Sequence, residues 1–87
     1  MQKIITATGL EFDIIWCGLA TVDHVLRFEI KGSTMQAVLQ TFTDSRETAT
    51  LTHVFDELET VYTGYTLFIG VDMQPRGSIV VSLMIED

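Results

Sequence analysis

Apolar and polar residues alternate along the first third of the chain. In residues 10–17 and 25–31 every second residue is apolar, and residues 3–8 are mostly β-branched. A period of two places neighbouring side chains on opposite faces of a strand, so these three segments predict strands. Gly9 marks a turn between residues 3–8 and 10–17, which we therefore expect to pair as a hairpin.

The period changes in residues 34–43, where apolar residues recur every three or four positions. This spacing predicts a short amphipathic helix. Ser33 and Gln36 have the spacing of a capping box, in which each side chain bonds a main-chain N–H of the other residue. A helix this short is not stable alone, so we expect it to cover the sheet; presentation to a partner or ligand is the alternative. Its apolar stripe consists of Met35, Val38, Leu39 and Phe42.

Strand patterns return after the helix. Threonines alternate with apolar residues in 47–55, and the polar segment 56–60 predicts a turn or a single helical turn. The alternation is longest in 61–73, whereas 78–85 is apolar on both faces, as is typical of a central strand. A turn is predicted at 74–77, because its proline restricts φ and its glycine permits a positive φ.

Together these segments predict one α+β domain over residues 1–87. We expect a mainly antiparallel sheet of about six strands, in the order β-β-β-α-β-β-β, with one short covering helix. A domain of 87 residues is near the lower limit for a chain that folds around its own core. We therefore expect that a protein partner or a homo-oligomer contributes to its stability.

Twelve acidic residues stand against five basic ones, so the net charge is −7. This charge disfavours direct binding to nucleic acid, which depends on Lys and Arg displacing counterions. It allows the opposite role, in which carboxylates imitate phosphates and occupy the groove of a nucleic-acid-binding enzyme. It also simply keeps a small domain in solution. The candidate acidic surface, which flanks one predicted strand, consists of Asp44, Glu47, Asp56, Glu57 and Glu59.

No pattern in the sequence indicates catalysis. A nucleophile needs a base within hydrogen-bond reach, and the candidates Cys17, His24 and His53 lie in separate segments. We expect Cys17 to be a buried, unreactive side chain. Common metal-binding and phosphate-binding spacings are also missing. We expect a protein that is not an enzyme, with no catalytic, metal-binding or cofactor-binding residues and no cofactor.

The single cysteine allows no disulfide within the chain, which favours a reducing compartment. The N-terminal residues do not resemble a signal peptide, and the apolar runs are far shorter than the ~20 residues of a membrane helix. We expect a cytoplasmic protein with no membrane contact.

Four motifs together resemble a known group of proteins. They are G-x-x-F-x-I-x-W-C-G from Gly9, D-x-x-L-R-F-E-I from Asp23, F-T-D-S-x-E-T from Phe42 and Y-T-G-Y-T-L-F-x-G from Tyr62. The chain is similar to short, poorly characterised proteins of tailed phages and prophages of Gram-positive bacteria, often encoded near tail and baseplate genes. The resemblance spans nearly the whole chain and implies a minor virion component or an accessory protein acting on the host. It brings no catalytic residue.

We therefore expect a phage-associated, non-enzymatic protein–protein interaction domain, a minor structural or assembly component located in the host cytoplasm or the virion. The alternative is an acidic inhibitor of a host defence or nucleic-acid-binding enzyme. Residues 48–54 lack the Lys, Arg, Pro and Gly that usually protect a sheet edge. We expect pairing with another strand at this segment, through the main chain beside Thr48, Thr50 and Thr52.

Overall fold

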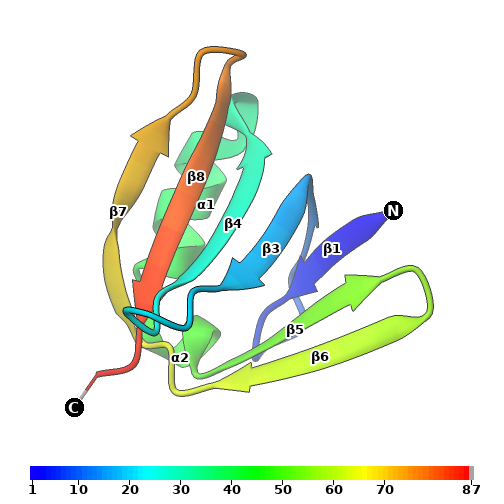
Figure 1. Ribbon diagram of the computed structural model, residues 1–87, viewed down its shortest axis with the longest axis vertical. Coiled ribbons are helices and arrows are strands. Elements are labelled where there is room, and N and C mark those ends of the chain that lie inside the picture. Colours follow the sequence, from blue (N-terminus) through cyan, green and yellow to red (C-terminus); the bar gives the residue numbers. More distant parts are fainter. Residues whose placement is uncertain (87) are drawn as a thin grey trace.

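Two antiparallel sheets of four strands each make up most of residues 1–86, the part of the chain that the computed structural model describes (Figure 1). All neighbouring strands in them run antiparallel. This confirms the α+β class and the mainly antiparallel pairing. The first sheet has the order β2 (Glu11–Ile14), β1 (Gln2–Ile5), β5 (Thr50–Phe55), β6 (Leu58–Thr63). The second has the order β3 (Trp16–Leu19), β4 (Leu26–Lys31), β8 (Ser78–Met84), β7 (Leu67–Met73).

Residues 1–86 contain eight strands instead of about six, mainly because two predicted strands are each divided between the sheets. Residues 10–17 break at Ile15 into β2 and β3. Residues 61–73 break at 64–66 into β6 and β7, and Gly64 there has a φ of 83°. Each half keeps its alternation, so the period of two does not reveal where the chain leaves one sheet for the other.

The strand β6 begins within the segment that was predicted to be a turn. Only Asp56 and Glu57 connect β5 to β6, and Asp56 adopts a φ of 55°. Leu58 already pairs with Phe55. The predicted turn is present at residues 56 and 57, but the prediction was wrong for 58–60, because a polar composition is typical of turns and equally compatible with a strand that faces solvent.

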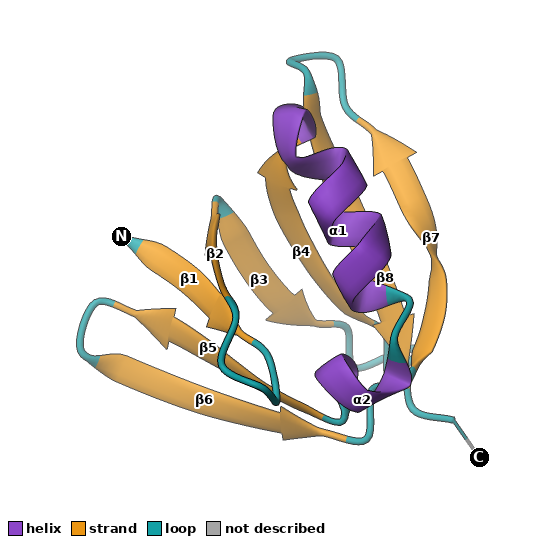
Figure 2. Cartoon of the chain, turned by 180° about the vertical axis from the view of Figure 1, so that it is seen from behind, coloured by secondary structure: helices purple, strands orange, loops and turns teal. Residues whose placement is uncertain are grey.

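The helix α1 (Met35–Phe42) covers one face of the second sheet, as predicted (Figure 2). Val38 and Phe42 are fully buried, and Met35 packs partly against the core. The prediction for Leu39 was wrong: its side chain is 39% exposed, and Thr41 is buried instead. The buried face of the helix is therefore centred slightly away from the apolar stripe.

The predicted capping box does not form. The 3₁₀ turn η1 (Gly32–Thr34) precedes α1, so Ser33 lies inside this turn and Thr34 is the N-cap residue. The Thr34 hydroxyl donates to the main-chain oxygen of Lys31 at 2.7 Å rather than accepting from α1. Gly32 places the turn against the β7–β8 connection, because a Cβ at this position would overlap the main-chain oxygen of Gly77.

Three phenylalanines join the helix to both sheets. The ring of Phe42 in α1 lies 4.8 Å from that of Phe28 in β4 and 5.3 Å from that of Phe12 in β2, measured between centroids. Both contacts are tilted, an arrangement that favours aromatic pairs. The buried cluster around them contains Ile4, Ile14, Leu26, Ile30, Val38, Leu51, Tyr65, Ile79, Val81 and Leu83.

Removing the Phe42 ring should destabilise the domain strongly. We expect Phe42→Ala to lower the free energy of unfolding by about 3–5 kcal/mol, because it opens a cavity where the helix meets both sheets. Leu39→Ala is the matched control on the same helix and should cost less than about 1.5 kcal/mol, because Leu39 is partly exposed. Urea unfolding followed by circular dichroism measures both. Equal losses would contradict the placement of these side chains.

Candidate interaction surface

The five predicted acidic residues do not form one surface. Asp44 and Glu47 lie at α2 (Ser45–Thr48), beside the start of β5. Asp56, Glu57 and Glu59 lie at the hairpin turn, at the opposite ends of β5 and β6 (Figure 1). The structure thus separates the carboxylates into two groups, with the length of two strands between them.

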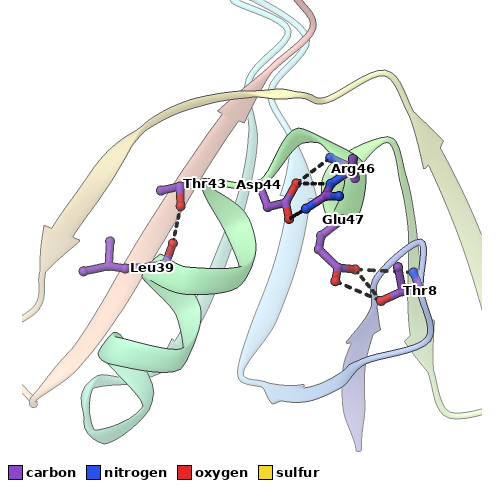
Figure 3. Close-up of polar contacts among 6 residues, drawn as sticks. All are labelled: Thr8, Leu39, Thr43, Asp44, Arg46 and Glu47. Atoms are coloured by element: carbon purple, nitrogen blue, oxygen red, sulfur yellow. Dashed lines mark hydrogen bonds and ion pairs between the residues drawn. The ribbon is translucent and has the colours of Figure 1, made fainter.

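Three of these carboxylates already have partners. Asp44 accepts hydrogen bonds from the main-chain N–H of Arg46 at 3.0 Å and from its guanidinium at 3.1 Å, and this guanidinium lowers the pKa of Asp44 (Figure 3). Glu47 accepts from the Thr8 hydroxyl at 2.7 Å, which lowers the pKa of Glu47 (Figure 3). Asp56 lies 2.9 Å from the N-terminal amine. The first two contacts cap α2 and hold it against the turn after β1.

The predicted edge strand is an inner strand. Thr50 and Thr52 belong to β5, which pairs with β1 on one side and with β6 on the other. Thr48 is the last residue of α2, and its buried hydroxyl has no hydrogen-bond partner among the described residues. The prediction was wrong because it did not recognise β6, the strand that occupies the outer side of β5.

The strand β6 is the open edge of the first sheet. Within residues 1–86 the other sheet edges are β2 and β3, which have only four residues each, and β7, which carries a bulge between Phe68 and Gly70. Short strands and bulges both discourage pairing with another chain. By contrast, β6 has six residues, regular pairing with β5, and no Lys, Arg, Pro or Gly.

The direction of its main-chain groups follows from one hydrogen bond. Gly64, directly after β6, donates its N–H to the oxygen of Ala49 at 2.9 Å. In an antiparallel pair, every second residue directs both its N–H and its C=O toward the partner. The even-numbered residues of β6 therefore bond β5, and the odd-numbered ones direct their main-chain groups outward. These outward residues are Glu59, Val61 and Thr63.

Apolar side chains are exposed along the same strand. Leu58 is 74% exposed and Val61 58%, and Phe55, which pairs with Leu58, is 47% exposed. By alternation, Phe55 and Leu58 lie on one face of the sheet and Val61 on the other. At the far end, half-buried Tyr62 packs against Tyr65 with ring centroids 5.9 Å apart. Both faces of the open edge thus carry apolar contact area.

The three reactive side chains remain separate. Cys17 is half-buried in β3, and burial raises the pKa of its thiol to about 12. His53 in β5 has its Nε2 2.8 Å from Oε1 of Gln2, and burial lowers its pKa. His24 lies in the exposed connection between β3 and β4. Within residues 1–86 no hydrogen bond joins any two of them, so the arrangement offers no nucleophile–base pair.

An open groove of about 410 Å³ lies beside β4, η1 and the β7–β8 connection. At its wall, Glu29 in β4 accepts hydrogen bonds from Nε1 of Trp16 at 2.6 Å and from the hydroxyl of Ser78. These two bonds, and the nearby Arg76, hold the pKa of Glu29 below its ordinary 4.5. The carboxylate thus links β3, β4 and β8, and each of its two oxygens already accepts a hydrogen bond. The groove is lined by Ile15, Glu29, Lys31, Gly32, Ser33, Arg76, Gly77 and Ser78.

Replacing Thr48 should stabilise the domain. Thr48→Val exchanges a buried hydroxyl without a partner for a methyl group of similar size, so we expect the free energy of unfolding to rise by about 1–2 kcal/mol. Thr48→Ser keeps the hydroxyl but loses the methyl and should be destabilising. Thermal and urea unfolding measure both variants. A destabilised Thr48→Val protein would indicate that the hydroxyl has a hydrogen-bonding role.

The Glu29 carboxylate should stabilise the fold in a pH-dependent way. Because its pKa is lower in the folded state, its contribution is present above about pH 4.5 and is lost as the pH falls through the folded-state pKa. The loss of stability in Glu29→Gln relative to wild type should therefore be larger at pH 7 than at pH 3. Trp16→Phe removes one donor and should show part of this difference. Urea midpoints at both pH values test it; a pH-independent difference would contradict it.

No group of three or more His, Cys, Asp and Glu side chains in residues 1–86 is arranged to hold a metal ion. In the same residues, the helices are too short or too polar to span a membrane. Comparisons with protein-family models, with curated proteins and with solved structures find no match.

Proposed function

We propose that this chain is a non-enzymatic protein–protein interaction domain that acts by accepting a strand at the open edge of β6. The observation that carries the proposal is the row of outward main-chain groups at Glu59, Val61 and Thr63, on a regular strand without Lys, Arg, Pro or Gly. Such an edge binds a partner through main-chain hydrogen bonds, with side chains on both faces adding contact area.

The exposed apolar residues support this role. Leu58 and Val61 lie on opposite faces of the same edge strand, so an added strand would cover part of each. Removal of apolar surface from water is the main favourable term in most protein association. The separation of Cys17, His24 and His53 fits a protein that works by contact and not by catalysis.

The similarity of the sequence to tailed-phage proteins suggests the setting. We propose that the domain is a minor structural or assembly component of a phage particle, present in the host cytoplasm before assembly and in the virion afterwards. An extended edge suits such a role, because one strand of a neighbouring protein is enough to attach the domain.

Inhibition by nucleic-acid mimicry is less well supported. A mimic needs closely spaced carboxylates on one surface, and the candidate residues divide into two groups. In the group at α2, hydrogen bonds occupy Asp44 and Glu47 and give both of them a local structural role. The remaining group of Asp56, Glu57 and Glu59 belongs to a single hairpin end.

The proposal predicts incorporation into particles through β6. In the strain that encodes the chain, the wild-type protein should co-purify with phage particles and resist washing with about 1 M salt, where the Debye length is about 3 Å. Val61→Pro removes an outward N–H without breaking the ladder to β5, so it should fold but be lost from particles.

A matched control changes the neighbouring residue. Tyr62→Pro removes an N–H that bonds β5, and should unfold the hairpin. Quantitative mass spectrometry of purified particles measures incorporation, and circular dichroism reports folding. Wild-type protein found only free in cells, or released from its target by salt, would favour the inhibitor instead.

A further inference from the structure

We infer that the strand added to β6 is the β6 of a second copy, which runs antiparallel and is centred on Val61. This inference rests on the proposed use of the β6 edge and names its partner. The product is a symmetric dimer in which the two first sheets join into one continuous sheet, with the order β2-β1-β5-β6 followed by its reverse.

The main-chain groups select the register. The main-chain N–H and C=O groups of the odd-numbered residues point outward. Hydrogen-bonded pairs can therefore form only in registers that place odd residues of one copy opposite odd residues of the other. Centring on Val61 places Val61 opposite its own copy and Glu59 opposite Thr63 of the second copy. Each outward residue of both strands then exchanges both main-chain hydrogen bonds. Centring on Thr60 would leave Thr63 opposite the hairpin turn of the second copy and lose bonds.

The same register matches the faces of the two sheets. Residues directly opposite each other in a ladder project from the same face, and the Val61 register opposes odd residues with odd and even with even. Val61 therefore meets Val61 of the second copy on one face, and Thr60 meets Tyr62 of the second copy on the other. A shift by one residue would place Tyr62 opposite Val61 and mix a core face with a solvent face.

The charges favour the antiparallel arrangement. The carboxylates Asp56, Glu57 and Glu59 all lie at the hairpin end of β6, whereas residues 60–66 carry no charge. In the antiparallel dimer, the acidic end of each strand lies beside the neutral end of the other. A parallel pair would instead bring the acidic ends of both strands together at one end of the interface, where like charges repel. A chain of net charge −7 can therefore associate here without opposing its carboxylates.

Cysteine cross-linking tests the register. In a Cys17→Ala background, Val61→Cys places two thiols opposite each other across the dimer axis, with Cβ atoms about 5 Å apart. Thr52→Cys is the matched control, because Thr52 pairs with Val61 on the same face but one strand further in. Its thiols would be about 14 Å apart, three strand spacings. A cross-linker that spans about 8 Å should thus join Val61→Cys and not Thr52→Cys.

Sedimentation of the purified protein tests the dimer itself. We expect a dimer whose dissociation constant changes little with salt and rises about tenfold or more in Val61→Pro, which loses main-chain hydrogen bonds at the axis. Circular dichroism verifies that each variant is folded.

Three results would overturn the inference: a wild-type chain that stays monomeric at high concentration, a dimer that Val61→Pro does not weaken, or equal cross-linking at positions 52 and 61. A monomer whose Val61→Pro variant is still lost from particles would overturn only the choice of partner. In that case the added strand comes from another protein and the proposed function stands. A dimer with the expected cross-links, but no protein in particles, would overturn the phage role alone.

Discussion

The contact of Phe42 with Phe12 and Phe28 holds the three parts of this domain together. Each ring comes from a different unit: Phe42 from α1, Phe12 from the first sheet and Phe28 from the second. Two four-stranded sheets and an eight-residue helix would each be marginal alone, because none can bury its apolar face without the others. The rings supply a large buried area at the one place where all three meet.

Two of the predicted strands pass from one sheet to the other around this shared core. The crossing at Ile15 lets β2 and β3 belong to different sheets while Phe12 and Phe28 face the same core. The crossing at 64–66 ends the first sheet at β6 and begins β7 in the second. The strand β6 is thus the last strand of the first sheet, and its outer edge stays open.

The acidic excess has several separate roles in this fold. Asp44 and Glu47 fix α2, Glu29 links β3, β4 and β8, and Asp23 pairs with Arg27 at 3.2 Å. Hydrogen bonds from Arg27, Arg46 or Ser78, among others, lower the pKa values of these carboxylates. These four carboxylates therefore have local structural roles, whereas Asp56, Glu57 and Glu59 gather at the hairpin end of β6.

The sequence by itself determined the local structure: the strands, the short covering helix and the α+β class. These follow from the period of the apolar residues, which depends only on neighbours along the chain. Antiparallel pairing was predictable from short turns between neighbouring strands, such as the one at Gly9. Only the tertiary structure decided where 10–17 and 61–73 divide, that Leu39 is partly exposed, and that β5 lies inside its sheet while β6 forms the edge. Alternation is unchanged when a strand passes from one sheet to another, and it says nothing of which strands lie side by side. The open edge, and the pairing proposed for it, therefore depend on contacts between residues far apart in the chain, such as those between β1 and β5.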